Sequence, residues 1–226
     1  MLIRLLPLLV GVAPVAAISG AYWLGVQHEI LPTCNPYVDG CTSISSTGRH
    51  PPGSYLFRAA QLPVAALLTI VWYFSKMWLN QLNSGVQLKK TDVMFVSGLI
   101  GSIALIVYVT FLGTSGPVYE FMRRFGIYFY FLGTAVAQLL LSLTLLKFSK
   151  VAPLNSLRKL SFQMLVLAAL PFALGILNLA LKAILNNADA IGNSIEWIAS
   201  LAMQTWFVLL YVAWRRTGFQ VGVRSG

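Results

Sequence analysis

Residues 160–182, LSFQMLVLAALPFALGILNLALK, contain no charged side chain before Lys182. About 20 apolar residues are enough for an α-helix to cross the hydrocarbon core of a bilayer. That core offers the backbone no water, so a spanning segment must pair its N–H and C=O groups internally. This stretch therefore predicts a membrane-spanning helix.

Five further stretches have the same length and character: 5–26, 56–78, 92–113, 125–147 and 196–214. A soluble protein with a large core does not repeat apolar runs this long with so few charges. The sequence thus predicts an all-α polytopic membrane protein. We expect a six-transmembrane-helix bundle that forms a single domain over 1–226, with an ordered first extracytoplasmic loop. The first stretch also has the composition of a signal peptide, but it continues past Trp23, which favours a retained helix.

The distribution of the net charge of +10 predicts the orientation. With both termini in the cytoplasm, most of the 16 basic residues fall on the cytoplasmic side, as the positive-inside rule requires. They are Arg4, Lys76, Lys89, Lys90, Lys147, Lys150, Arg158, Lys159, Arg215, Arg216 and Arg224. The basic face either fixes topology alone or also contacts anionic lipid headgroups. A nucleic-acid partner is not expected, and the membrane is either a eukaryotic endomembrane or plasma membrane, or a bacterial inner membrane.

The first outer connection, residues 27–55, is the longest and is rich in proline and glycine. Long connections of this kind are usually functional or disordered. Tyr37 and Ile44 give this one apolar groups to pack, so we expect an ordered cap. Cys34 and Cys41 are the only cysteines, and a disulfide between them suits an oxidising compartment. Two free thiols are the alternative, and we expect no metal site.

Polar residues recur inside the predicted helices at helical spacing. Such groups are either interhelical hydrogen-bonding pairs or functional sites. One face of the fourth helix carries Tyr130, Thr134, Gln138 and Ser142, and one face of the sixth carries Glu196, Ser200 and Gln204. The fifth helix carries Asn178 and Lys182 beyond Pro171. We expect Gln138, Asn178 and Gln204 to form an intramembrane polar network, and Gly98, Gly101 and Ser102 to allow close helix contact.

Glu196 lies at the outer mouth of the sixth predicted helix and is followed by Trp197. It is either solvated at the interface beside an ordinary belt aromatic or directed inward and paired with Arg49, Arg58, Arg123 or Arg124. The sequence contains no G-x-S-x-G, H-E-x-x-H or phosphate-loop pattern. Catalytic residues are therefore unassigned, with His50, the loop serines and Glu196 as the available groups, and no cofactor is expected.

Residues 41–57, CTSISSTGRHPPGSYLF, resemble the first outer loop of the damage-regulated autophagy modulators and the wider Frag/DRAM/Sfk group. The pattern in that group is of the type I-S-D-x-G-x-x-P-P-x-S-x-x-F. Ile44, Ser45, Pro51, Pro52, Ser54 and Phe57 match it, while Ser46 stands in place of the aspartate. The Glu196–Trp197 pair matches the start of the last helix in the group. Arg123 or Arg124 replaces a histidine of the fourth helix.

The resemblance implies six spans with cytoplasmic termini and a role in membrane lipid handling, with lipids and a membrane protein as partners. The members are linked to remodelling of glycosylphosphatidylinositol (GPI) anchors, phospholipid distribution and autophagy. Hydroxyl, backbone and guanidinium donors at the outer face suit a phosphate or glycan headgroup. The candidate headgroup-binding residues are Ser45, Ser46, Gly48, Arg49, Glu120, Arg123 and Glu196.

The leading hypothesis is a protein that binds lipid headgroups at its extracytoplasmic face and assists or regulates lipid remodelling or distribution. A membrane-embedded lipid acyl hydrolase or transferase is the alternative, so whether the chain is an enzyme stays open. A small-solute transporter that uses the polar interior is a further alternative.

Overall fold

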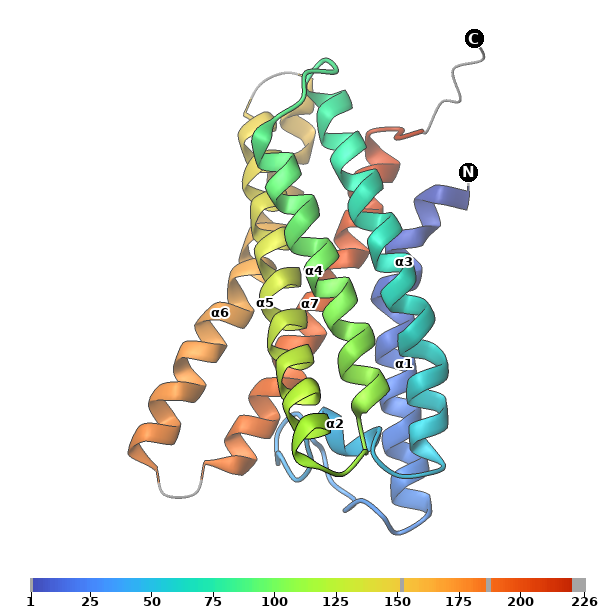
Figure 1. The fold of residues 1–226 in the computed structure, drawn as a ribbon. Coiled ribbons are helices and arrows are strands. Elements are labelled where there is room, and N and C mark those ends of the chain that lie inside the picture. Colours follow the sequence, from blue (N-terminus) through green and yellow to red (C-terminus); the bar gives the residue numbers. More distant parts are fainter. Residues whose placement is uncertain (1, 151–152, 186–187, 221–226) are drawn as a thin grey trace.

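The chain folds into long α-helices joined by tight connections, with one short helix in the loop after the first (Figure 1). A computed structural model describes residues 2–150, 153–185 and 188–220. Arg224 lies outside these residues. The helices are α1 (Leu6–Gln27), α2 (Ile44–Thr47), α3 (Gly53–Leu82), α4 (Lys89–Phe111), α5 (Pro117–Phe148), α6 (Arg158–Ile184) and α7 (Asp189–Arg216).

All of these helices except α2 are long and apolar enough to cross a membrane, which confirms the predicted all-α, six-span fold class. Several extend past the apolar stretches that predicted them. α5 begins at Pro117 rather than near residue 125, and α7 begins at Asp189 rather than at Glu196. Proline is well suited to the first turn of a helix, and an acidic residue there interacts favourably with the helix dipole. The apolar stretches thus correspond to the central part of each helix, and polar residues continue the helix beyond them.

α4 and α5 approach closely through small residues, among them Gly101 of the set that the sequence predicted to allow close contact. A methyl group added at Gly133 would lie 2.7 Å from the Ser97 carbonyl oxygen and 2.8 Å from the Gly101 nitrogen. At Gly98, the indole of Trp72 occupies the space that a side chain would need. Small residues let helix backbones come together where no hydrophobic effect drives their association.

The predicted polar faces of α5 and α7 meet inside the bundle. Gln138 donates from Nε2 to the carbonyl oxygen of Met203 at 3.0 Å, and Gln204 donates from Nε2 to the Tyr130 hydroxyl at 3.2 Å. One turn away, Trp206 donates from Nε1 to Ser142 Oγ at 2.9 Å. These bonds hold the two helices in register.

Tryptophan pairs fill the contact between α3 and α7. The Trp72 ring lies 5.9 Å from Trp206 and 5.5 Å from Phe207, and Trp78 lies 6.4 Å from Trp214. All five side chains are buried. Large buried rings therefore fill the space between α3 and α7, while α6 lies at the periphery with few buried residues.

The connection between α1 and α3, residues 28–52, forms an ordered cap over one end of the bundle (Figure 1). A disulfide joins Cys34 to Cys41, as predicted. The Tyr22 hydroxyl of α1 accepts from the Cys34 backbone N–H at 3.0 Å and donates to the Cys34 carbonyl oxygen at 2.8 Å. We call this end of the molecule the cap end.

α7 supplies the second attachment of the cap. Asn193 donates from Nδ2 to the Gly40 carbonyl oxygen at 2.8 Å, and Trp197 donates from Nε1 to the Thr42 carbonyl oxygen at 2.9 Å. Trp197 is buried, and Tyr37 packs on it edge to face. Trp197 therefore anchors the cap instead of lying in a lipid-facing aromatic belt.

α6 leaves the bundle toward the cap end (Figure 1). Its buried residues, Leu160, Ser161, Met164 and Ala168, all lie in its first half. Beyond Pro171, side chains such as Ile176, Leu179 and Ile184 are exposed. The second half of α6 thus has open space beside it.

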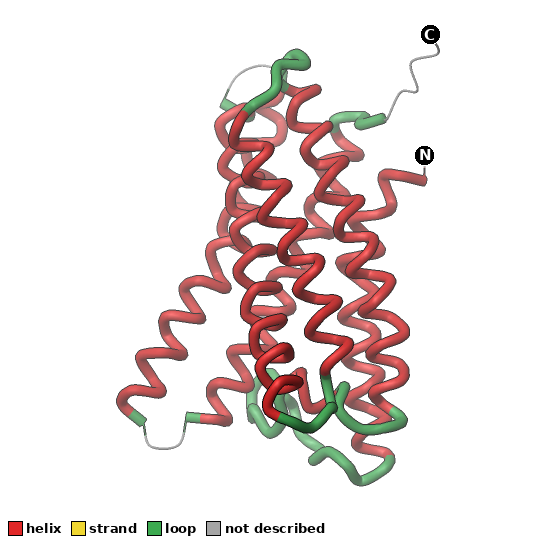
Figure 2. Tube along the Cα trace, viewed as in Figure 1, coloured by secondary structure: helices red, strands yellow, loops and turns green. Residues whose placement is uncertain are grey.

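The described parts of both termini lie at the end opposite the cap (Figure 2). Arg4 connects them by donating from Nε to the Phe219 carbonyl oxygen at 2.6 Å and from Nη2 to the Gly218 carbonyl oxygen at 2.9 Å. We call this end the terminal end. Lys76 of α3 and Asp92 of α4 form an ion pair there at 2.7 Å.

Gly40→Ala should destabilise the cap strongly. Gly40 has φ +58°, and an added methyl group would overlap the carbonyl oxygen of Ala190 in α7. Gly85→Ala is the matched control, because φ is +81° there and no atom lies within 4 Å of the added group. The left-handed conformation alone costs an alanine about 1–2 kcal/mol. We expect a clearly larger fall in the unfolding temperature in detergent for Gly40→Ala, and equal falls would show that α7 does not constrain this loop.

Candidate functional site

A large cavity lies where α6 separates from α5 and α7, beside the cap. Its volume is about 1050 Å³. The cap contributes Ser45 and Arg49, and α4 contributes Tyr108. The three other helices supply Arg123, Arg124, Ile127, Tyr128, Phe131, Leu132 and Ala135 from α5, Pro171, Phe172, Gly175, Ile176, Asn178, Leu179 and Lys182 from α6, and Asp189, Gly192, Asn193, Ile195, Glu196 and Ala199 from α7.

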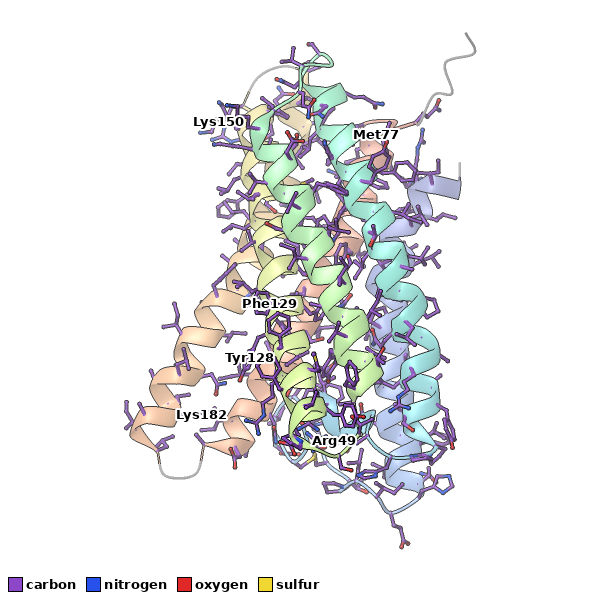
Figure 3. The ribbon with its side chains drawn as sticks, in the orientation of Figure 1. Arg49, Met77, Tyr128, Phe129, Lys150 and Lys182 are labelled. Atoms are coloured by element: carbon purple, nitrogen blue, oxygen red, sulfur yellow. A yellow bond between two sulfur atoms is a disulfide. The ribbon has the colours of Figure 1, made fainter. Side chains whose placement is uncertain are left out.

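The rim of this cavity at the cap end is basic. Four cationic side chains line it, Arg49, Arg123, Arg124 and Lys182, with the carboxyl group of Asp189, while Glu196 lines the cavity about two turns further along α7. Figure 3 shows Arg49 and Lys182 at the cap end, whereas Lys150 lies at the terminal end. The rim therefore favours an anionic group.

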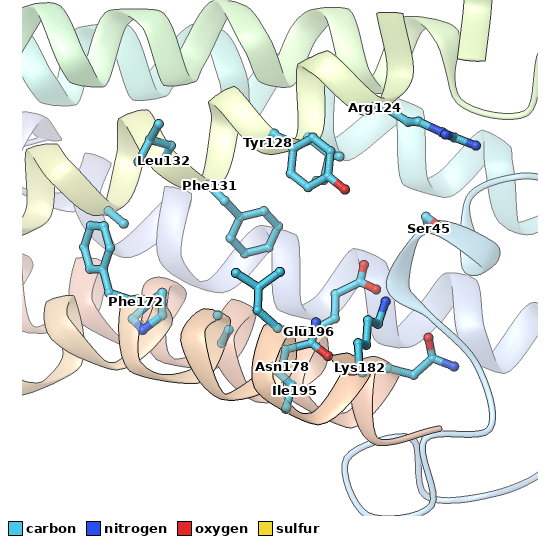
Figure 4. A pocket seen from close by; sticks show the side chains of 18 of the residues that line it. Ser45, Arg124, Tyr128, Phe131, Leu132, Phe172, Asn178, Lys182, Ile195 and Glu196 are labelled. Atoms are coloured by element: carbon cyan, nitrogen blue, oxygen red, sulfur yellow. The ribbon is translucent and has the colours of Figure 1, made fainter. Parts of the chain in front are cut away.

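The wall below the rim is apolar. Phe131 and Leu132 face the cavity from α5, and Phe172 faces it from α6 (Figure 4). Lys182 and Pro171 are separated by three turns of α6, or about 16 Å at 1.5 Å per residue. The cavity thus changes over that depth from a charged mouth to an aromatic and aliphatic interior.

Arg49 is held in place by the serines of the cap. It donates from Nη2 to Ser45 Oγ at 2.9 Å. Ser43 Oγ lies 3.0 Å from Ser45 Oγ and caps α2 by accepting from the Ser46 backbone N–H at 3.2 Å. The Nε atom of Arg49 is buried and has no partner in the structure. The guanidinium is therefore preorganised, with donor capacity left unused.

Glu196 faces the cavity from the second turn of α7 and is partly buried (Figure 4). The positive charges of Arg49 and Lys182 interact favourably with the Glu196 carboxylate. The backbone N–H groups of Ile44 and Ser45 in the cap do the same. Within the described residues, Glu196 forms no ion pair closer than 4.0 Å. The inward orientation is therefore the one observed, without a direct pair to Arg49, Arg58, Arg123 or Arg124.

The structure separates the predicted headgroup residues into two groups. Ser45, Arg49, Arg123 and Glu196 line the cavity, but Ser46, Gly48 and Glu120 do not. Ser46 bonds to Ser43 inside the cap, Gly48 packs against Phe57 and Leu112, and Glu120 is exposed and lies 3.7 Å from Arg124.

The three polar residues predicted to form one network have separate environments. Gln138 and Gln204 bond to the α7 backbone and to Tyr130 in the bundle core, whereas Asn178 lines the cavity on α6. In the described structure, no hydrogen bond joins the three to one another. The divergence of α6 carries Asn178 away from the other two.

Lys182, Tyr108 and Asn193 line the cavity but are not among the site residues predicted from the sequence. A signal existed for Lys182, since it lies four residues after Asn178 and so on the same helix face. Tyr108 carried no such signal, because aromatic residues in a membrane helix are usually part of the packing. His28 and His50 are both exposed, and neither lines the cavity.

Comparison with known proteins gives one match. A model of the family described as Frag1/DRAM/Sfk1/Cwh43P N-terminal domain matches residues 3–216, which includes all six long helices. No curated protein and no solved structure matches the chain.

Proposed function

The chain belongs to the Frag1/DRAM/Sfk1/Cwh43P N-terminal domain family, and from that premise we propose that it binds an anionic lipid in the cavity between α5, α6 and α7. The lipid headgroup lies at the basic rim and an acyl chain lies along the apolar wall. Through this binding the protein assists or regulates the remodelling or distribution of membrane lipids. The observation that carries the proposal is the basic rim directly above an aromatic and aliphatic wall.

The charge at the rim supports a phosphate-bearing ligand. Guanidinium groups bind phosphate with paired, charge-assisted hydrogen bonds, and an ammonium group contributes a point charge. Arg49 is already oriented by Ser45, while Arg123 and Lys182 reach the same space from α5 and α6. A ligand that bridges these groups would join the cap to both helices.

The membrane environment supports a ligand that is polar at one end. Hydrocarbon satisfies no hydrogen-bonding group, so polar atoms that face the bilayer interior need a partner. The Oδ1 atom of Asn178 and the Nε atom of Arg49 are buried and have no partner in the structure. Acyl chains alone would leave both unsatisfied, whereas a headgroup and its linkage supply donors and acceptors.

The position of α6 supports entry from the bilayer. The second half of this helix is exposed, so the space between α5 and α6 is accessible to lipid without passage through water. The remodelling or distribution role itself is supported by family membership. A transporter is less well supported, because Gln138 and Gln204 already bond to groups inside the bundle.

Removal of rim charge should weaken lipid binding. Arg123→Gln and Arg49→Gln should each reduce the amount of phosphatidylglycerol that co-purifies with the protein by about 10- to 100-fold, since a hydrogen bond to a charged group contributes about 1.5–3 kcal/mol. Native mass spectrometry measures this occupancy. Lys89→Gln, an exposed charge at the terminal end, is the control and should retain the lipid. Unchanged occupancy in both rim variants would contradict the proposed headgroup site.

An obstruction of the apolar wall should have the same effect without a change of charge. Gly175 lines the cavity, and no atom lies within 4 Å of a methyl group placed on it. Gly175→Trp should therefore fill the acyl-chain space and lower lipid occupancy several-fold. Ile184→Trp adds the same ring on the same helix outside the cavity lining and should leave occupancy unchanged. Equal occupancy in the two variants would place the acyl chain elsewhere.

We propose that the cap end is extracytoplasmic and that both termini are cytoplasmic. A membrane-impermeant maleimide can test this in sealed vesicles whose outer surface is the cytoplasmic face. Lys89→Cys at the terminal end should react at once, and Ser115→Cys in the exposed connection before α5 should react only after the vesicles are opened. The reverse pattern would invert the protein and place the cavity in the other leaflet.

A further inference from the structure

A second, much smaller chamber lies behind the lipid cavity, inside the bundle. Its volume is about 30 Å³. It shares Tyr108, Ile127, Phe131 and Glu196 with the lipid cavity, so the two spaces adjoin at these side chains. A space of this size holds one water molecule if polar groups surround it.

The polar groups of the chamber lack partners. Tyr108 is 3 % exposed and its hydroxyl has no hydrogen bond, and Gln204 is 4 % exposed with Oε1 unpaired. The Nε2 atom of Gln204 already bonds to the Tyr130 hydroxyl, which fixes the side chain with its oxygen free. Buried polar groups are normally satisfied by protein or by ordered water. The chamber therefore has the groups that bind a water molecule.

Glu196 lines both this chamber and the larger cavity. It is seven residues into α7 from Asp189, which places it about 10 Å below the start of the helix. In a glycerophospholipid, the acyl ester linkages follow the phosphate toward the hydrocarbon. A phosphate bound at the rim would thus bring an ester carbonyl to the depth of Glu196.

We propose that Glu196 and a water molecule in the chamber form a hydrolytic centre for an acyl ester of the bound lipid. This inference rests on the proposed function, since it requires a lipid in the cavity. The Glu196 carboxylate removes a proton from the water, and the water oxygen attacks the acyl carbonyl carbon. The bond from that carbon to the glycerol oxygen then breaks, and the glycerol oxygen takes the proton from Glu196. The products are a free fatty acid and a lysolipid.

Tyr108 has a defined part in this reaction. Tyr108 lines both spaces, and its unpaired hydroxyl is a donor for the oxyanion that forms on the carbonyl oxygen. Glu196 and Tyr108 act on the ester, whereas the rim cations bind the headgroup. Glu196→Gln and Tyr108→Phe should therefore slow the reaction without removing the cations that bind the headgroup.

The test uses the purified full-length chain in nanodiscs that contain phosphatidylglycerol, phosphatidylserine, phosphatidic acid or phosphatidylinositol, in water enriched in oxygen-18. Mass spectrometry measures oxygen-18 in the released fatty acid and, separately, the lipid bound to the protein. Wild type should release labelled fatty acid from at least one lipid. Glu196→Gln should reduce the rate about 100-fold and Tyr108→Phe by a similar factor, while bound lipid changes less than about twofold. Glu29→Gln, an exposed carboxyl outside both spaces, should react like wild type.

Measuring both oxygen-18 in the fatty acid and lipid bound to the protein distinguishes a failure of the hydrolytic centre from a failure of lipid binding. Bound lipid with no labelled fatty acid across the four lipids would overturn the hydrolytic centre and leave lipid binding intact. Equal rates in wild type and Glu196→Gln would also overturn it, because the reaction would then not depend on the Glu196 carboxylate. The absence of bound lipid in wild type would overturn the binding proposal and this inference together.

Discussion

A bilayer interior offers no partner to a polar group, and this constraint determines most of the structure. It requires the spanning segments to be helices and requires the polar side chains of α5 and α7 to bond across their interface. Gln138, Gln204 and Trp206 each donate to a protein partner across this interface, while the Oε1 atoms of Gln138 and Gln204 have no partner in the structure. Around the α6 cavity the requirement is not met by protein, since Asn178 and Arg49 retain unpaired atoms. The cavity differs from the core because its unpaired atoms border a space of about 1050 Å³ with a basic rim, and this difference supports the proposed binding site.

α7 connects the cap, the core and the cavity because consecutive residues point in different directions from a helix. Trp197 faces the cap and α1, whereas Glu196 faces the cavity. Adjacent residues are about 100° apart around the axis, so one turn of helix can attach the cap and present a carboxylate. The hydrogen bond from Trp197 to Thr42 also keeps Ser45 and Arg49 at the cavity mouth. The contacts that attach the cap to α7 therefore also position the cap side chains that line the cavity.

The sequence was sufficient for the spans, the disulfide and the polar faces of α5 and α7, since each depends on local composition or spacing. Close packing of α4 was also predictable from Gly98 and Gly101, although not which neighbour each glycine contacts: α3 at Gly98 and α5 at Gly101. The divergence of α6 from the bundle was not predictable, because its apolar residues are compatible with either a buried or a lipid-facing helix. That divergence separates Asn178 from Gln138 and Gln204 and brings Lys182 into the site. The position of Ser46 and Gly48 away from the cavity depends on the turn at α2, which residue types alone do not specify.

The divergence of α6 also gives the molecule an unequal cross-section, broader toward the cap end than toward the terminal end (Figure 1). A body of this shape occupies more area in one leaflet than in the other, so it acts as a wedge. Neighbouring lipids accommodate a wedge with least strain where the membrane bends, with the leaflet at the cap end on the convex side. The separation of α6 that creates the cavity would thus also bias where in a curved membrane the protein resides.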